Sequence, residues 1–414
     1  MLQPLLFLFG YTYNPVGNIL DILDQVNPAE NRSHTYDALQ RLKTGGAVAN
    51  AETYDYDLVG NRTTSFLSST HNHDDLNRLT EDDQFLYTYD NNGNLETKTN
   101  KTTPTEVTTY HWDAQDQLIQ IDRPDSTTVT YKYDGLGRRI EKNVDSTITR
   151  YVYDGEDILL EYDGSNTFVA RYSHGDQVDQ PLVLQKAGLG FFYYHSNHQG
   201  SITHLTDSSG TIANSYMYDS YGRQLSVAES VIQPFSYTGR EYDGESGLYF
   251  YRARYFDATT GRFFSEDPIR FAAGDQNFYR YVGNNPLNFI DPDGFIQGQG
   301  ERNFASGPGG TPNPFKGMKQ DPNNPDRVLF KDPQTGKTKS KAKPEGFDEA
   351  MYKKGKKGGG QKSGGKVQCD SPTSEGDSQS FEDAAEAGFA AGVTAAILRG
   401  LGFIGGGIGS LIFN

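Results

Sequence analysis

The chain of 414 residues has a single cysteine, Cys369, which excludes an internal disulfide framework. It is also short of basic residues: 38 Lys and Arg stand against 54 Asp and Glu, and the net charge is −16. This balance argues against nucleic-acid binding by the chain as a whole. Hydrophobic residues make up only 35%, yet there are 46 Gly, 27 Tyr and 24 Phe. Aromatic strands joined by glycine-rich turns favour sheets whose two faces are both partly wet.

Motifs of several enzyme classes are missing. No glycine-rich loop follows a strand and opens a helix, so nucleotide binding has no support. Ser265 has no histidine at a readable spacing, which disfavours a nucleophilic serine. His195, His198 and His204 are spaced loosely like metal ligands, but no cysteine or Glu-x-x-His motif accompanies them. We expect these histidines to pack in strands or bond in turns, with a metal site as the alternative, and we predict no cofactor.

The first nine residues do not form a signal peptide, because they lack a positive segment and a small-residue cleavage site. Phe7, Phe9, Tyr11 and Tyr13 alternate with other residues up to a Tyr-Asn turn. This alternation predicts a strand over residues 5–13 that belongs to a repeat already under way. We therefore interpret the chain as the C-terminal end of something longer, or as a truncated relative of it.

A tyrosine followed by an aspartate recurs through the first half of the chain, and turn residues follow each copy. The copies are Tyr36-Asp37, Tyr56-Asp57, Tyr89-Asp90, Tyr133-Asp134, Tyr153-Asp154 and Tyr218-Asp219, with degenerate ones at Tyr13-Asn14, His73-Asp74 and Trp112-Asp113. From Tyr13 to Tyr153 the steps are 16 to 23 residues long. This period predicts one hairpin-sized unit repeated many times.

One unit shows what each copy does. Tyr87 and Tyr89 alternate with a threonine, as in a half-buried strand. Residues 90–93 then supply Asp, two Asn and Gly, which are residues that tolerate or require turn conformations. Leu95 and Thr97 restart the alternation. The sequence therefore predicts an all-β array of hairpins.

These repeats resemble the YD repeats of Rhs proteins and of insecticidal toxin-complex C subunits. Residues 192–223 resemble the strand pair that precedes the Rhs-associated core. Residues 237–269 read YTGREYDGESGLYFYRARYFDATTGRFFSEDPI, and residues 277–294 read NFYRYVGNNPLNFIDPDG. Together these two segments resemble that core closely. The resemblance covers about residues 11–295.

The resemblance implies a polymorphic toxin. In that family the repeats coil into a hollow β-shell, the core plugs one end, and a variable C-terminus is the enclosed cargo. It implies a YD-repeat shell segment over 1–230, an Rhs-associated core over 231–295, a variable basic region over 296–383 and an apolar tail over 384–414. Fewer than 300 residues of repeat and core are too few for the full shell. We expect further shell from a longer N-terminal part or a separate chain, unless the copy is a decayed remnant.

The core of the family is similar to an aspartyl peptidase that cuts its own chain once, after an Asp-Pro-x-Gly motif. Carried over by motif, the carboxylate pair is Asp267 and Asp291, and Arg254 matches the family's functional arginine. Two carboxylates that share a site have split pKa values, so one acts as base and the other as acid. Phe295 stands where the family has leucine. We expect cleavage between Phe295 and Ile296, with a slow or shifted cut as the alternative.

The character of the chain changes after Phe295. Residues 296–325 are rich in Gly, Pro and Asn and are interpreted as a linker. Residues 316–366 hold 13 Lys and one Arg against six acids, a charge of +8 that leaves −24 for the remainder. Residues 327–336 predict a small hairpin, whereas 353–365 (KKGKKGGGQKSGG) predict a flexible linker. The alternative to a solvated linker is contact with nucleic acid or anionic lipid.

The end of the chain is apolar. Residues 384–398 are helix-prone, with acids near the start. The span 387–413 is long enough to cross a bilayer, and it contains small residues four apart. Arg399 lies near its centre, and such an arginine costs about 2.5–3.5 kcal/mol on insertion scales. A membrane-inserting tail, an apolar segment packed in the shell and a disordered remnant all stay open.

Three functions follow from these patterns. The first is a self-cleaving toxin fragment that releases residues 296–414 as an effector in bacterial competition or host intoxication. It would be secreted or displayed on a bacterial surface by a secretion system and paired with an immunity protein. The second is a structural or adhesive cell-surface YD-repeat protein without catalysis. The third is a degenerate orphan Rhs tip. We favour the first, and the sequence names no target for the effector.

Overall fold

The computed structural model describes residues 8–295, 298–299, 319–321, 324–331 and 338–342. The chain divides into two units, residues 1–343 and 344–414, and every described residue lies in the first. The described residues form only β-strands and short 3-10 turns, which confirms the all-β prediction.

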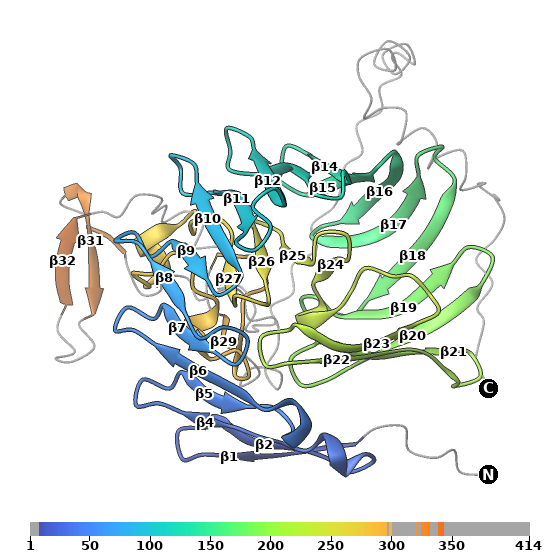
Figure 1. Ribbon diagram of the computed structural model, residues 1–414, viewed down its shortest axis with the longest axis horizontal. Helices are drawn as coiled ribbons and strands as arrows, with labels where there is room; N and C mark the ends of the chain where they lie inside the picture. The colour runs from blue at the N-terminus through green and yellow to red at the C-terminus, as the bar shows by residue number, and fades with distance from the viewer. Residues whose placement is uncertain (1–7, 296–297, 300–318, 322–323, 332–337, 343–414) are drawn as a thin grey trace, which may run out of the picture. The chain divides into compact units, whose positions relative to one another are not determined.

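Most strands belong to an antiparallel meander, in which strands that neighbour one another in a sheet are also consecutive in the chain (Figure 1). Its first two sheets are β1 (Phe9–Tyr13), β2 (Ile19–Asp24) and β3 (Arg32–Ser33), then β4 (Thr35–Tyr36), β5 (Leu42–Gly45), β6 (Glu52–Tyr56) and β7 (Arg62–Ser65). The 3-10 turns η1 (Pro28–Glu30) and η2 (Val48–Asn50) lie among them.

A single sheet of sixteen strands continues the meander. Its strands are β8 (His71–His73), β9 (Leu79–Asp82), β10 (Phe85–Tyr89), β11 (Leu95–Asn100), β12 (Val107–Trp112), β13 (Leu118–Asp122), β14 (Thr128–Tyr133), β15 (Arg139–Val144), β16 (Thr147–Asp154), β17 (Asp157–Asp163), β18 (Phe168–His174), β19 (Pro181–Lys186), β20 (Gly190–Ser196), β21 (Ile202–Asp207), β22 (Ile212–Tyr218) and β23 (Gln224–Glu229). We call β1–β23 the strip.

Residues 231–295, here called the core segment, form a separate four-stranded sheet and several turns. The sheet holds β24 (Glu241–Asp243), β25 (Leu248–Tyr251), β26 (Arg254–Asp257) and β27 (Arg262–Phe263). The other elements are η3 (Tyr237–Gly239), η4 (Arg270–Ala273), η5 (Val282–Asn284) and β28 (Phe289–Ile290). Figure 1 shows this sheet on the inner side of the curved strip.

Four short strands follow Phe295. β29 (Gly298–Gln299) pairs with β28, and β30 (Lys319–Asp321), β31 (Asn324–Lys331) and β32 (Thr338–Ala342) form a sheet of their own. A hairpin is predicted over residues 327–336; β31 does form one, but its partner β32 lies beyond that range. β29 and β30 lie within residues 296–325, the predicted linker. This segment therefore contains some regular strand structure. The predicted tail, 387–413, lies outside the described residues, among which no helix is long and apolar enough to span a membrane.

The aspartate of the repeat stabilises its turn from within. In the turn after β4, Asp37 Oδ1 accepts hydrogen bonds from the backbone N–H groups of Leu39 and Arg41, at 2.9 and 3.0 Å. Arg41 Nε donates to Asp37 Oδ2 at 2.6 Å. The same arrangement recurs around Asp134 and Asp219. A side-chain oxygen that accepts from its own downstream backbone favours aspartate at this position, and Asn14 and Asn197 make the same bonds in their turns.

The tyrosine of the repeat ties each hairpin to the one before it. Six of the nine repeat aromatics donate to the backbone carbonyl that directly follows the preceding turn. The bonds are Tyr36 to Ile19 (2.7 Å), Tyr56 to Leu42 (2.8 Å), Trp112 to Leu95 (2.7 Å), Tyr133 to Leu118 (2.7 Å), Tyr153 to Arg139 (2.9 Å) and Tyr218 to Ile202 (2.7 Å). The strip is therefore held together across its repeats by side chains as well as by the ladder.

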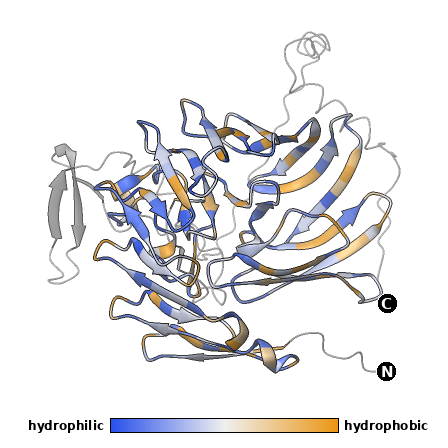
Figure 2. Ribbon diagram, in the orientation of Figure 1, coloured by the Kyte–Doolittle hydropathy of each residue, from blue (hydrophilic) through white to orange (hydrophobic). Residues whose placement is uncertain are grey.

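The inner face of the strip is packed against the core segment. Apolar and polar residues alternate along the strands in Figure 2, as expected when one face is buried. Tyr110 packs edge-on against Phe264, with ring centroids 5.2 Å apart, and Tyr131 packs on Tyr255 at 5.5 Å. The buried Arg139 of β15 also pairs with Glu241 at 2.8 Å and with Asp243. The core segment is thus fixed to the strip by both apolar and ionic contacts.

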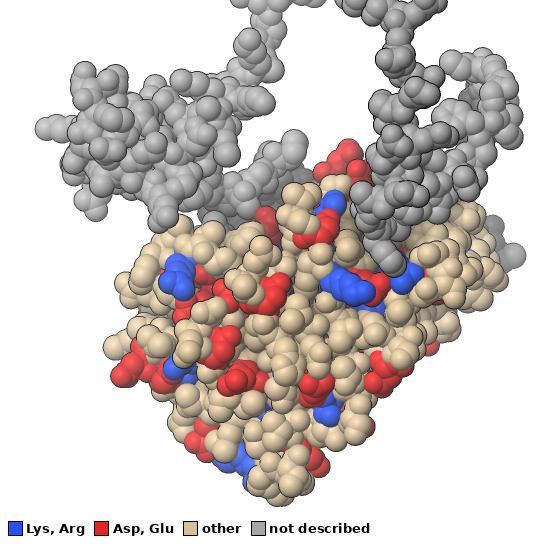
Figure 3. All heavy atoms as spheres, turned by 90° about the horizontal axis from the view of Figure 1, so that it is seen from above, with Lys and Arg blue, Asp and Glu red and all other residues tan. Residues whose placement is uncertain are grey.

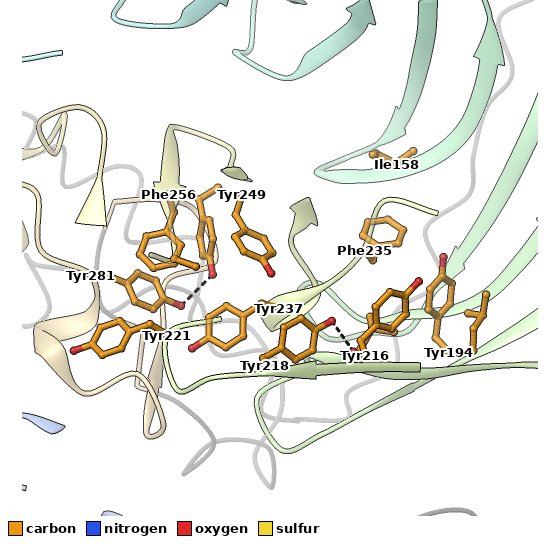
Figure 4. Packing of buried hydrophobic residues seen from close by; sticks show 14 of the residues in the cluster. Ile158, Tyr194, Tyr216, Tyr218, Tyr221, Phe235, Tyr237, Tyr249, Phe256 and Tyr281 are labelled. Atoms are coloured by element: carbon orange, nitrogen blue, oxygen red, sulfur yellow. Dashed lines mark hydrogen bonds between the residues drawn. The ribbon is translucent and has the colours of Figure 1, made fainter. Parts of the chain in front are cut away.

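A second aromatic cluster lies where the end of the strip meets the core segment (Figure 4). Tyr249 donates to the Gly222 carbonyl at 2.7 Å, and the rings of Tyr218 and Tyr237 are 5.9 Å apart. The hydroxyls of Tyr251 and Tyr281 are 3.1 Å apart. Burying one large apolar side chain contributes about 1.5–3 kcal/mol, so this cluster is a main source of stability.

Residues at the end of the strip also contact its first strands. Arg32 donates to the Tyr218 carbonyl at 2.6 Å, and the hydroxyls of Tyr56 and Tyr221 are 2.8 Å apart. The buried Glu52 accepts from the backbone N–H of Ser220 at 3.1 Å. These are side-chain contacts, and β23 ends its sheet with β22 as its one neighbour.

Acidic side chains are spread over much of the face in Figure 3, and basic ones are fewer. This distribution agrees with the excess of acids in the sequence.

We predict that Tyr133→Phe weakens the strip without changing its fold. The substitution leaves the Leu118 carbonyl unpaired, which costs about 1–3 kcal/mol of unfolding free energy. Urea unfolding followed by tyrosine fluorescence measures the loss. Tyr193→Phe, at a tyrosine that is 41% exposed, is the matched control and should change stability by less than about 0.5 kcal/mol. Equal effects of the two substitutions would contradict the role given to the repeat tyrosine.

Candidate functional site

The structure brings Arg254, Asp267 and Asp291 together in the core segment. Arg254 opens β26, Asp267 follows the end of β27, and Asp291 follows β28 directly. All three are buried, with 2%, 6% and 2% of their surface exposed. Buried charges need partners, and these residues supply one another with them.

The guanidinium of Arg254 lies between the two carboxylates. Its Nη2 is 3.2 Å from Asp267 Oδ2 and 3.2 Å from Asp291 Oδ2. Its Nη1 donates to the Phe278 carbonyl at 2.9 Å, and its Nε donates to the Gly294 carbonyl. The guanidinium carbon lies 3.6 Å from the centre of the Phe263 ring, in a cation–π contact. The arginine is therefore fixed on all sides.

The peptide group between Gly294 and Phe295 is held at both ends. Its carbonyl accepts from Arg254 Nε, and its N–H donates to Asp291 Oδ1 at 3.1 Å. Gly294 has φ +71, and a Cβ there would lie 2.3 Å from the Tyr251 carbonyl oxygen. Only glycine fits this position without strain. The Asp-Pro-Asp-Gly turn thus folds the following peptide back onto its own aspartate.

Burial raises the pKa of Asp267 to about 6. Arg254 and the backbone N–H of Ile269, which bonds Asp267 Oδ1 at 3.0 Å, oppose this rise, whereas Asp291 and Asp275 add to it. Burial also lowers the pKa of Arg254, and both carboxylates counter that effect. Asp267 is therefore a carboxyl group that takes up a proton close to neutral pH.

A cavity of about 100 Å³ adjoins the three residues. Asp275, Phe278 and Phe295 line it together with Arg254, Asp267 and Asp291. A volume of this size is ample for water, which needs about 10–15 Å³ on the same measure. The site can therefore admit a water molecule next to both carboxylates.

The described chain is also held beyond the expected cleavage point. Ile296 lies outside the described residues, but Gly298–Gln299 pairs with Phe289–Ile290 as β29 with β28. The chain thus runs from β28 through the turn and back beside β28.

Sequence reasoning missed two residues that hold the turn. Arg252 donates to the Pro292 carbonyl, and Asp179 in turn accepts from Arg252 Nη2 at 2.8 Å. Arg252 stands two residues before Arg254, and this spacing was a usable signal for a second arginine at the same site. Asp179 lies in a polar loop between β18 and β19, where nothing in the sequence marks it.

Two of the three histidines are cross-strand neighbours, and the third, His198, contacts the core segment. His195 and His204 face each other in the β20–β21 ladder, and His195 Nε2 is 2.9 Å from the Thr206 hydroxyl. His198 Nε2 is 3.1 Å from the Leu287 carbonyl, and burial lowers the pKa of His198 to about 4. Within the described part of the chain, no group of three His, Cys, Asp or Glu could hold a metal ion.

Comparison with known proteins places this geometry in a family. The Teneurin YD-shell family model matches residues 6–287. The tRNA nuclease WapA of Bacillus subtilis is 33% identical over 260 residues, which is 58% of this chain and 11% of the relative. The probable deoxyribonuclease RhsA of Dickeya dadantii is 27% identical over 313 residues, which is 69% of this chain and 21% of the relative.

A solved structure is similar as well. The crystal structure of TcdB2-TccC3 has a TM-score of 0.48 and 21% identity, and the match covers 70% of this chain and 17% of that one. The chain spans about a tenth of the length of the first curated relatives, 11% for WapA. The family model covers well over half of the chain, and the relatives carry Rhs and WapA names. The chain therefore belongs to the Teneurin YD-shell family, within the Rhs and YD-repeat toxins that the sequence resembles.

Proposed function

We propose that the core segment is a single-turnover aspartyl peptidase that cuts its own chain between Phe295 and Ile296. One observation carries the proposal: the peptide group that precedes this bond is clamped between Arg254 and Asp291 in a buried site that also contains Asp267. The buried group of Arg139, Glu241 and Asp243 fixes the core segment to the strip, whereas the group around Arg254 bonds to a peptide next to the expected cut and adjoins a cavity.

The two carboxylates take different parts. Asp291 accepts the proton of a water molecule, whose oxygen bonds to the carbonyl carbon of Phe295. Asp267, with a pKa raised to about 6, holds the proton that goes to the departing nitrogen of Ile296 as the carbon–nitrogen bond breaks. Arg254 keeps the turn in place and balances the second negative charge when both carboxyl groups are ionised.

The cut would release residues 296–414 as the effector of a bacterial toxin. Relatives with nuclease names and the family's shell support this reading, in which secretion or surface display delivers the protein. Further shell, from a longer N-terminal part or another chain, and an immunity protein are the expected partners. Membrane contact by residues 387–413 is one route by which the effector could act, and the sequence assigns it no nuclease motif.

We predict that the purified wild-type chain is cut into two fragments, residues 1–295 and 296–414, whose masses match a cut after Phe295. Asp267→Asn and Asp291→Asn should each give one uncut mass, because an amide can neither take nor give the proton. Intact-mass spectrometry of the three proteins measures this directly. Asp125→Asn, at an exposed turn aspartate, is the control and should cut like wild type.

An uncut wild-type chain would favour a structural or adhesive role, or a decayed tip. A cut at the same bond in either site variant would show that the carboxylate pair is misassigned.

Cleavage should slow as the pH rises above 6. Asp267 is protonated below a pKa of about 6, and the protonated fraction falls about tenfold per pH unit above it. The chain can be purified uncut in denaturant, diluted into buffers between pH 5 and 8.5, and sampled on gels. Tyrosine fluorescence of Asp291→Asn shows that refolding is not limiting. A rate that is flat or rises with pH would exclude Asp267 as the proton donor.

We predict that Gly294→Ala stops or strongly slows cleavage while the sheets stay folded. The new methyl group would meet the Tyr251 carbonyl and move the 294–295 peptide off its two partners. Gly188→Ala is a matched control, because Gly188 has a similar φ of +73 but open space around its Cβ position. Circular dichroism tests whether the variant is folded, and intact-mass spectrometry tests whether it is cut. Cleavage of Gly294→Ala at the wild-type rate would show that the clamp is not needed.

A further inference from the structure

The turn that carries the expected cleavage point is held from a second side by Arg252. Arg252 Nη1 donates to the Pro292 carbonyl and lies 3.5 Å from Asp293 Oδ1. The backbone N–H of Ala253 donates to the Asp293 carbonyl at 3.3 Å. Arg254 holds the next carbonyl, that of Gly294. Residues 252–254 therefore grip three consecutive residues of the turn.

The position of the Arg252 side chain depends on its partners in the strip. The φ of Arg252 is +56, a conformation that belongs to the two-residue turn between β25 and β26. Its Nη2 donates to Asp179 Oδ1 at 2.8 Å, its Nε lies 3.0 Å from Glu156 Oε2, and its side chain is 13% exposed. Glu156 is itself exposed, so Asp179 is the buried carboxylate that holds the guanidinium where it reaches Pro292.

Asp179 belongs to the strip and not to the core segment. It lies in the loop between β18 and β19, and its side chain is 8% exposed. Arg240, just before β24, also donates to Asp179 Oδ1. Two arginines of the core segment thus converge on one carboxylate of the strip. The contact forms only when this hairpin of the strip has docked on the core segment.

We propose that Asp179 is a positioning residue that makes self-cleavage depend on docking of the β18–β19 hairpin. The inference rests on the proposed function and adds an order of events: the strip closes on the core segment first, and the bond is cut second. Without the Asp179 carboxylate, Arg252 loses its buried partner and keeps the exposed Glu156, so its guanidinium and the turn that it holds shift. A displacement of about 1 Å at a reacting bond costs about a hundredfold in rate.

The first test is the rate of cleavage in the full-length chain after dilution from denaturant. Asp179→Asn should cut at least tenfold more slowly than wild type, at the same bond. The pH midpoint should stay near that of wild type, because Asp267 is unchanged. Asp176→Asn is the matched control, since Asp176 is exposed in the same loop. A wild-type rate in Asp179→Asn would overturn the proposal.

Loss of a buried ion-pair partner can also destabilise the fold as a whole. Hydrogen exchange separates the two effects in the Asp267→Asn background, which stays uncut. Adding Asp179→Asn should speed exchange at the amides of Ala253 and Phe295 and leave the β8–β11 hairpins protected. Unchanged exchange at these two amides would contradict the proposal.

If Asp179→Asn speeds hydrogen exchange at amides throughout the described chain, the cleavage rate of a second variant, Arg252→Lys, tests the proposal. The lysine keeps the charge beside Asp179 but has one nitrogen in place of the two with which Arg252 spans Asp179 and Pro292, so cleavage should again slow. A wild-type rate in Arg252→Lys would overturn the proposal. Failure of the proposed function would look different: the wild-type chain itself would stay whole, while the exchange measurement would still report on the turn.

Discussion

A buried guanidinium must have its charge balanced and its donors met, and in this protein that requirement shapes the core segment. Arg254 is 2% exposed, and its partners are two carboxylates and two backbone carbonyls from three separate places in the sequence. Each of those partners can reach it only if β26, the turn after β27 and the turn after β28 are packed together. The need to neutralise this charge therefore also fixes the path of the chain. It fixes the peptide group between Gly294 and Phe295 as well, because that group bonds to Arg254 and Asp291.

The strip packs against the core segment that contains this site. Its tyrosines and aspartates serve local purposes, since the hydroxyl ties a hairpin to the previous one and the carboxylate caps its own turn. Repetition of these two bonds yields a long curved sheet that covers the aromatic side of the core segment. Burial of Asp267 is the main cause of its raised pKa. The residues that line the cavity beside Asp267 all belong to the core segment, so the core segment itself supplies this desolvation.

Much of the fold could be predicted from the sequence, because its determinants are local. The alternation around Tyr87 and Tyr89 and the turn at Asp90 gave β10 and β11 directly. The Tyr153-Asp154 copy behaves differently: Asp154 pairs with Asp157 across a short turn instead of capping a longer one. Asp134 is also followed by a glycine and keeps the longer turn, so the repeat pattern alone did not reveal the shorter loop.

The candidate site was predictable only in part. Resemblance pointed to Arg254, Asp267 and Asp291, and the structure brings them together. The position of the guanidinium between the carboxylates and the contribution of Asp179 depend on long-range packing. No spacing rule connects a loop of the strip with a turn of the core segment, so such contacts are visible only in three dimensions.

N-terminal sequencing of the C-terminal product is the most direct test of the account. Cleavage of the bond that follows the clamped peptide group predicts a new chain that begins with Ile296. A product that begins elsewhere, or the absence of any new N-terminus in folded wild-type protein, would contradict the claim that this turn presents its own chain to the buried carboxylates.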